Sequence, residues 1–362
     1  MELGITYGES NKMNKFLTEI LEQPKSLEAT LNYYTDQEGV KVLNLINTYF
    51  NKNDFQEIIF TGMGSSYFSS LAASYLFNSL GIRAYAINTS ELLYYNFSLI
   101  TNKTLLVCVS QSGESIEIVN LLKKLHNNFS FVGVSNEENS SLSKSTDMIL
   151  LTKAGKEEMT STKTYTSSLL ALFILGWTLS KKLKREKIQS IKNLILSTSE
   201  LLANYNNLIS NEFDFLGDIE FLEFIARGPL FSSALQSELM FKEASKLPSS
   251  ATLGGEFRHG PMEMVDSNFN AILFTANGNT FEQSINMASD IAKFNGKVIV
   301  ITNKRPSISD MNIRFITINQ PDEYLFSIQS IIPVQLMVNY FALSKGYEPG
   351  NFIHGSKVTL TE

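Results

Sequence analysis

The feature that most constrains the fold of this chain is a strand–turn–helix pattern that recurs with an offset of about 165 residues. Short apolar runs end in turns of Gly, Ser, Thr or Asn, and stretches with helical spacing follow them, as in parallel α/β sheets. Five segments match in order and in register, so we interpret the chain as a duplicated α/β unit. The matching pairs are Ile59–Gly64 with Phe224–Gly228, Phe68–Ser70 with Phe231–Ser233, Ser90–Glu91 with Gly255–Glu256, Ser110–Ser115 with Phe274–Thr280, and Val132–Asn136 with Val300–Asn303.

The pattern predicts an α/β fold with two tandem doubly wound parallel sheets, each an α-β-α sandwich, and 362 residues suit two such domains. We expect helical segments in residues 1–50, broken at Pro24, and an amphipathic helical connector over residues 185–215. The predicted organisation is a helical N-terminal segment (1–50), a first domain (51–190), a second domain (191–345) and a docked C-terminal tail (346–362). The strands expected in the first domain are Glu57–Phe60, Arg83–Ile87, Leu105–Val109, Phe131–Val134 and Met148–Leu151, and its helices include Tyr67–Leu80 and Ile116–Leu125.

The turn Ser110–Ser115 has the chemistry of an anion-binding loop. It follows a buried strand and precedes a helix, which is where open α/β sheets bind ligands. Gly113 permits a tight turn, three serines and Gln111 offer donors, and the start of the helix presents free N–H groups. No Lys follows the Gly, so the turn is not a nucleotide P-loop and suits one phosphate monoester better. The alternative, a Ser-rich loop that only caps a helix, is about equally compatible with composition alone.

Composition excludes several function classes. A net charge of −6 without a basic stripe disfavours nucleic-acid binding. One cysteine, Cys108, and no secretory signal pattern suit a reducing cytoplasm. The three histidines (His126, His259, His354) form no close pair of ligands, so we expect no metal site. The apolar segment Leu169–Leu179 is too short to span a bilayer and is typical of a buried helix.

Two residues of the second domain are candidates for proton transfer. Glu243 lies near the end of a mostly apolar helix, and His259 lies in a Gly-bounded loop, where a side chain is displayed rather than packed. A carboxylate and an imidazole form the pair needed to move protons next to a carbonyl. The alternatives are a solvated helix-face Glu and a hydrogen-bonded structural His. His126 is given no role.

The C-terminal tail, Gly350–Lys357, contains a His, a Lys and two Gly. It is either a frayed terminus or a docked segment. The apolar residues Phe352, Ile353, Val358 and Leu360 favour docking, and whether His354 or Lys357 reaches a site is left open.

Taken together, these motifs resemble the sugar isomerase (SIS) superfamily, and specifically proteins with two SIS domains. The chain is similar to the isomerase half of the glutamine–fructose-6-phosphate aminotransferase family and to fructosamine-6-phosphate deglycases. The resemblance covers nearly the whole chain. It is carried by Glu22–Pro24, Gly64–Tyr67, Ser110–Ser115, Ala154–Glu157, Ser161–Lys163, Lys242–Glu243, Gly255–Pro261 and Lys357–Thr359.

The resemblance implies roles for these positions. Ser65, Ser66, Ser110, Gln111, Ser112 and Ser115 would hold a sugar phosphate, and Ser161 would contact the sugar. Glu243 would move a proton between C1 and C2, and His259 would serve ring opening and proton transfer. Lys357, near the position of an imine-forming lysine, is the third candidate catalytic residue. The family implies a homodimer with the site at the subunit interface, and no redox or metal cofactor.

Three departures from the aminotransferase pattern affect the expected reaction. Met1 is not followed by the nucleophilic Cys of a glutaminase, so we expect no transfer of nitrogen from glutamine within this chain. Met240 stands where the family's helix carries a sugar-contacting Lys. The family's tail Lys precedes Ser-Val-Thr, whereas here Ser356 precedes Lys357.

These departures favour enzymes whose substrate already carries its nitrogen. The first reading is a deglycase that cleaves 6-phosphorylated sugar–amino acid conjugates to hexose 6-phosphate and a free amine. The second is a glucosamine-6-phosphate deaminase or isomerase. The third is a phosphosugar-binding protein without turnover, which the presence of both Glu243 and His259 disfavours. No reading includes nucleic acid or membrane as a partner.

Overall fold

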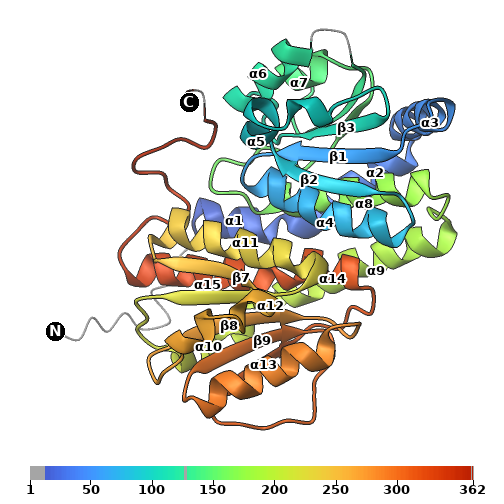
Figure 1. The fold of residues 1–362 in the computed structure, drawn as a ribbon. Helices are drawn as coiled ribbons and strands as arrows, with labels where there is room; N and C mark the ends of the chain where they lie inside the picture. Colours follow the sequence, from blue (N-terminus) through green and yellow to red (C-terminus); the bar gives the residue numbers. More distant parts are fainter. Residues whose placement is uncertain (1–12, 126–128, 360, 362) are drawn as a thin grey trace. The chain divides into compact units, whose positions relative to one another are not determined.

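The computed structural model describes residues 13–125, 129–359 and 361 (Figure 1). Among these residues, the strands form two five-stranded parallel sheets with the orders β2-β1-β3-β4-β5 and β10-β9-β8-β6-β7. The strands are β1 (Glu57–Gly62), β2 (Ala84–Asn88), β3 (Thr104–Val109), β4 (Phe131–Ser135), β5 (Ile149–Leu151), β6 (Leu222–Ala226), β7 (Ser249–Leu253), β8 (Asn270–Thr275), β9 (Lys297–Thr302) and β10 (Ile313–Thr317).

The helices of the N-terminal half are α1 (Lys15–Leu21), α2 (Gln23–Thr35), α3 (Gln37–Lys52), α4 (Ser65–Ser79), α5 (Thr89–Tyr94), η1 (Phe97–Leu99), α6 (Ile116–Leu125), α7 (Ser141–Lys144), α8 (Lys163–Leu179) and α9 (Arg185–Ala203). Those of the C-terminal half are α10 (Tyr205–Leu216), η2 (Gly228–Leu230), α11 (Phe231–Met240), η3 (Phe241–Ser245), α12 (Gly254–Phe257), η4 (Pro261–Met264), α13 (Phe281–Lys293), α14 (Glu323–Ser330) and α15 (Ile332–Ser344).

The two sheets confirm the predicted duplication. Each strand of the second sheet begins about 165 residues after its counterpart, and the two sheets have the same strand order. The predicted strands of the first domain differ from the observed ones by only one or two residues at their ends. Pro24 lies in the first turn of α2 and so starts a helix where α1 has ended.

The chain divides into two compact units, which we describe separately. The first-sheet unit comprises Glu22–Glu157, Ser161–Ile195 and Ile353–Glu362, and the second-sheet unit comprises Met1–Leu21, Glu158–Thr160 and Leu196–Phe352. The predicted boundaries at residues 50, 190 and 345 stay predictions.

Both sheets are buried on their two faces by helices, as Figure 1 shows. Every residue of β3 and β8 is buried, which explains why these strands are continuous apolar runs rather than alternating ones. On one face of the first sheet, Leu92 of α5 and Ile118 of α6 pack against Leu106 and Cys108. On one face of the second, Ile285 and Ile291 of α13 belong to the same cluster as Leu273, Val298 and Val300.

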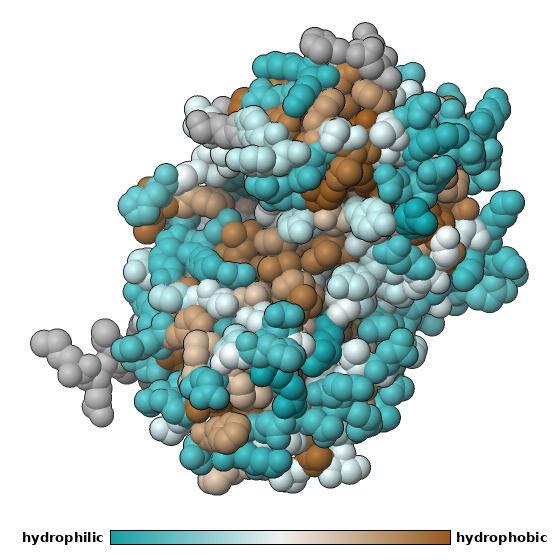
Figure 2. Space-filling model, viewed as in Figure 1, coloured by the Kyte–Doolittle hydropathy of each residue, from teal (hydrophilic) through white to brown (hydrophobic). Residues whose placement is uncertain are grey.

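The most apolar helix singled out from the sequence is a core helix, as predicted. Every residue of α8 except Thr178 is buried. A longer apolar stretch that the sequence analysis did not single out, Glu323–Ser344, spans α14 and α15. Of the described residues, this stretch alone is long and apolar enough to cross a membrane, and its apolar window is entirely buried, as in a core helix. Hydrophilic residues make up much of the face seen in Figure 2.

Candidate functional site

Two loops meet where the strand order of the first sheet reverses. The connection from β1 goes to its neighbour β2 on one side, whereas β3 pairs with β1 on the other side, so the switch point lies between β1 and β3. Gly62 at the end of β1 has no room for a side chain, because a Cβ would lie 2.9 Å from the Val109 carbonyl oxygen and 2.8 Å from the Ser66 carbonyl carbon. The turn with Ser65 and Ser66 therefore packs directly against the end of β3, as expected for a ligand site of this fold.

The loop Ser110–Ser115, which we call the cradle, is organised by its own hydroxyl groups. The Ser110 hydroxyl accepts a hydrogen bond from the Gly113 N–H (3.1 Å), and the Ser112 hydroxyl accepts one from the Glu114 N–H (3.2 Å). A hydroxyl that accepts a backbone N–H still has its own proton to donate. Gly113 has a φ of +65°, and a Cβ there would lie 2.1 Å from the Ser140 hydroxyl oxygen, so both conformation and space require glycine.

The backbone of Gln111, in the cradle, is held in place by two hydrogen bonds. The Gln111 carbonyl accepts hydrogen bonds from the Asn136 N–H (3.0 Å) and the Ser135 hydroxyl (3.2 Å). Ser110 is buried, whereas Gln111, Ser112 and Ser115 are half-buried, like Ser65 and Ser66 on the neighbouring turn. The structure thus brings six of the predicted phosphate contacts to one edge of one sheet, next to the N-terminus of α6.

The C-terminal tail contacts the cradle. The Ile116 N–H, at the start of α6, donates to the Thr359 carbonyl at 3.0 Å. Two residues earlier, the Lys357 ammonium lies 2.8 Å from the carboxylate of Glu157. Because residues 357 and 359 are at most about 7 Å apart along the chain, the tail joins the cradle to the Glu157 segment within the first-sheet unit.

The prediction that the tail docks through apolar side chains is wrong for Ile353, which is 60% exposed. Leu360, also assigned to that role, lies outside the described residues, as does His126. The tail contacts named above are polar instead, with an ion pair and a backbone hydrogen bond. His354 is exposed.

The side chain of Glu157 is fully buried. It accepts hydrogen bonds from the Thr162 N–H (2.9 Å), the Thr164 N–H (3.1 Å) and the Thr164 hydroxyl (2.5 Å). Burial raises the pKa of Glu157, but Lys357 and these donors outweigh that effect, so the pKa lies below its ordinary value. The carboxylate therefore holds both the tail and the start of α8.

The segment Ser161–Lys163 is held by the N-terminal Glu22–Pro24 motif. The Lys163 ammonium, with a side chain only 4% exposed, forms an ion pair with Glu22 at 2.5 Å. The Thr166 hydroxyl donates to the Gln23 side-chain oxygen at 3.2 Å. Ser161, predicted to contact the sugar, is half-buried and its hydroxyl lies 2.8 Å from that of Thr164.

Replacing Glu22 with glutamine should destabilise the protein, because the nearly buried Lys163 ammonium would lose its counter-charge. We expect a loss of about 2 kcal/mol in the free energy of unfolding, measured in urea. Glu28→Gln is the control, since Glu28 is an exposed residue of α2, the helix that follows Glu22. A loss at Glu22 no larger than at Glu28 would contradict this account.

Glu243, in the second-sheet unit, lies in a distorted turn. The α-helix α11 ends at Met240 and continues as one π-helical turn, Phe241–Ser245. Single π turns are rare in proteins, and many of those that occur lie at functional sites. Lys246 ends the turn with a left-handed φ of +56°, and its ammonium donates to the Glu243 carbonyl and, at 2.8 Å, to the Asn351 carbonyl. Burial lowers the pKa of Lys246 more than the Glu243 charge raises it.

The Glu243 carboxylate accepts a hydrogen bond from the hydroxyl of Thr160, which is buried. Thr160 belongs to the short segment Glu158–Thr160, whose backbone is fixed by the buried Glu19 of α1. The Glu19 carboxylate accepts the Glu158 N–H at 2.5 Å and the Met159 N–H at 3.3 Å. The orientation of the Glu243 side chain is thus set by residues far away in the sequence.

His259 lies on an exposed turn after α12. Its backbone N–H donates to the Glu256 carbonyl at 2.8 Å, and the neighbouring Arg258 is tied to Asp290 of α13 by a 2.8 Å ion pair. In the described part of the chain, the imidazole has no hydrogen-bond partner. The alternative of a hydrogen-bonded structural His is therefore not what the structure shows.

Three residues that position the candidate groups were not assigned a role from the sequence: Glu157, Thr160 and Lys246. Glu157 could have been noticed as a carboxylate three residues before a Ser/Thr run. Thr160 and Lys246 carry no local signal. Cys108 is buried, and burial raises the pKa of its thiol, which leaves it unreactive. Within residues 13–125, 129–359 and 361, no group of three or more His, Cys, Asp or Glu is arranged to hold a metal ion.

Comparison with known families identifies the family to which this fold belongs. The family model described as "SIS domain" matches residues 53–176 and 222–345, which are the two sheets with their helices. The chain belongs to the SIS domain family. Its two SIS domains confirm both the resemblance inferred from the motifs and the α/β fold class.

A curated relative is the glutamine–fructose-6-phosphate aminotransferase (isomerizing) of Pyrococcus horikoshii, with 30% identity over 339 residues. The match covers 92% of this chain and 55% of the relative, so the chain spans about half the length of that protein. Among solved structures, the C-terminal domain of the glucosamine-fructose-6-phosphate aminotransferase of Francisella tularensis superposes with a TM-score of 0.84 at 22% identity, covering 94% of this chain and 99% of that one. A glucosamine-6-phosphate deaminase of Thermotoga maritima superposes with a TM-score of 0.74 at 24% identity, covering 95% and 99%. These structural likenesses establish the fold.

Proposed function

We propose that this protein is a phosphosugar enzyme that transfers protons between neighbouring carbons, and specifically a deglycase of 6-phosphorylated sugar–amino acid conjugates. The observation that carries the proposal is the cradle: a loop of hydroxyl and amide donors at the sheet's switch point, beside a helix N-terminus. Donors without a lysine suit a single phosphate monoester.

In this proposal Glu243 removes a proton from the carbon that bears the nitrogen in the open-chain conjugate, and His259 protonates the oxygen on the neighbouring carbon, which gives an enaminol. A proton then returns to that neighbouring carbon while the nitrogen loses its own proton, and the enaminol becomes an imine. Water adds to the imine, and the carbon–nitrogen bond breaks to release hexose 6-phosphate and the free amine. Each positioned acid or base would contribute about 10²–10⁴ to the rate.

The ion pair of Lys357 supports a reaction in which the nitrogen arrives with the substrate. An ammonium held against a buried carboxylate has no lone pair with which to attack a sugar carbonyl, so imine formation on Lys357 is disfavoured. Met240, which replaces a sugar-contacting Lys of the aminotransferases, is fully buried and packs in the core. The exposed His259 leads us to propose also that a second copy of the chain receives this residue, as in a homodimer.

The second candidate is a glucosamine-6-phosphate deaminase or isomerase. It is supported by the relative named as an isomerizing aminotransferase. The same Glu243 and His259 would act on C2 and C1, and hydrolysis of the imine would release ammonia and fructose 6-phosphate.

A coupled assay for glucose 6-phosphate over a panel of fructosyl- and glucosyl-amino acid 6-phosphates tests the proposal. We expect release of hexose 6-phosphate from at least one conjugate. Ammonia release from glucosamine 6-phosphate without turnover of any conjugate would select the second candidate. Binding of sugar phosphate without product from either substrate would identify a binding protein.

Thr160→Val should slow turnover, because the carboxylate of Glu243 would lose the hydroxyl that orients it. We expect kcat to fall about 10-fold, as for the loss of one hydrogen bond to a charged group, with KM changed less than twofold. Thr160→Ser, which retains the hydroxyl, should recover most of kcat. A Val variant with wild-type kcat would show that Thr160 does not position Glu243.

A further inference from the structure

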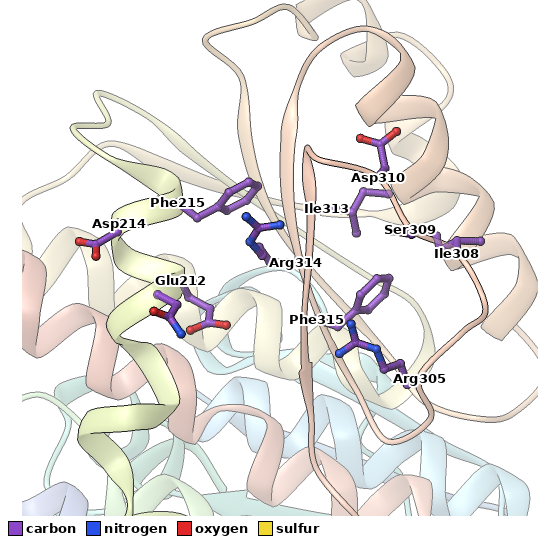
Figure 3. A pocket seen from close by; sticks show the side chains of 11 residues that line it. Glu212, Asp214, Phe215, Arg305, Ile308, Ser309, Asp310, Ile313, Arg314 and Phe315 are labelled. Carbon is purple, nitrogen blue, oxygen red and sulfur yellow. The ribbon is translucent and has the colours of Figure 1, made fainter.

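An open pocket of about 690 Å³ lies in the second-sheet unit (Figure 3). It is formed by α10, the connection from β9 to β10, and the edge strand β10. Its size is in the range of small-molecule sites. The side chains that give it its chemistry are Glu212, Phe215, Arg305, Asp310, Arg314 and Phe315.

Both arginines of the pocket are stacked on aromatic rings. The Arg305 guanidinium carbon lies 5.2 Å from the centre of the Phe315 ring, and that of Arg314 lies 4.8 Å from the centre of the Phe215 ring. Stacking holds the plane of a guanidinium while its N–H edges stay available for a partner that offers two oxygens, such as phosphate. Among the residues that the structure describes, neither guanidinium forms an ion pair or donates a hydrogen bond.

The pocket also contains carboxylates, but none of those that the structure describes forms an ion pair with either arginine. Glu212 is half-buried, and burial raises its pKa in spite of the nearby charge of Arg314. Asp310 already accepts a hydrogen bond from the Asn312 N–H at 2.8 Å. In Figure 3, Asp214 points away from both arginines.

We propose that this pocket is a second ligand site that binds a phosphorylated sugar, with the phosphate on the two stacked guanidinium groups. Carboxylates at neutral pH accept hydrogen bonds from hydroxyls, so Glu212 and Asp310 would bind hydroxyls of the ring. A pocket lined by both arginines and carboxylates suits a ligand with an anionic end and a hydroxyl-rich body better than it suits a simple anion. The site would sense the same chemical class as the proposed substrate, but its existence does not depend on turnover.

Isothermal titration of the full chain with glucose 6-phosphate tests this site. We expect two binding events per chain in the wild type. Arg305→Gln with Arg314→Gln should weaken one of them by at least about 10-fold, since each substitution removes charge-assisted hydrogen bonds. Ser110→Ala with Ser112→Ala, in the cradle, should weaken the other. Arg185→Gln, an exposed arginine of α9, is the matched control.

The outcomes separate this inference from the proposed function. One binding event that responds only to the cradle variant would overturn the second site and leave the proposed function intact. One event that responds only to the arginine variant would support the second site and count against the cradle. Inorganic phosphate that binds the arginine site as tightly as glucose 6-phosphate, or a mononucleotide that binds it in preference, would refute the assignment to phosphorylated sugars.

Discussion

Glu243→Gln protein will bind hexose 6-phosphate with unchanged affinity but will turn over its substrate about 10³-fold more slowly than the wild type. The amide has nearly the shape of the carboxylate and can still accept the hydroxyl of Thr160, but it cannot take a proton from carbon. Affinity should persist, because the proposed phosphate contacts lie in the first-sheet unit. Comparison of kcat with the dissociation constant for glucose 6-phosphate measures the two effects separately.

Glu282→Gln is the matched control, since Glu282 is an exposed carboxylate in the first turn of α13 in the same unit. It should retain full activity. Turnover by the Glu243 variant within a few-fold of the wild type would remove Glu243 from the mechanism, and the deglycase and deaminase readings would then both need another base.

Lys357→Met should lower the free energy of unfolding by about 3 kcal/mol, because it leaves the fully buried carboxylate of Glu157 without its counter-charge. An exposed pair gives the scale for comparison. Lys103→Met, which removes the partner of the solvent-exposed Asp54, should cost less than about 1 kcal/mol. Urea unfolding at neutral pH measures both losses.

The pH dependence of this loss has a definite sign. The pKa of Glu157 in the folded protein lies below its usual 4.5, so the ion pair stabilises fully above about pH 4.5 and its contribution disappears as pH falls through the folded value. The difference between wild type and Lys357→Met should therefore narrow in acid. Adding Glu157→Gln to Lys357→Met should recover part of the stability, because the buried charge is then gone. If Lys357→Met alone is as stable as the wild type, the tail is not anchored by this ion pair.

The strands were predictable because each depends on a local pattern. Leu105–Val109 is apolar without interruption, as a strand covered on both faces must be, and the structure extends it only to Thr104. The cradle was predictable for the same reason, since Gly113 and its neighbouring serines are adjacent in the sequence. The end of α11 was not predictable, because a π turn closed by a left-handed Lys246 has no consistent signature in sequence.

The amino-acid sequence by itself determined the duplicated α/β architecture, the family and the hydroxyl-rich turn Ser110–Ser115, since these follow from periodicity and from residues close together along the chain. Only the tertiary structure decided what holds the candidate catalytic groups. Glu157 and Lys357 are 200 residues apart, Glu22 and Lys163 are 141 apart, and Thr160 and Glu243 are 83 apart. Contacts over such separations arise when the chain folds back on itself and buries charges that must then find partners, and no local pattern records which partner each charge finds.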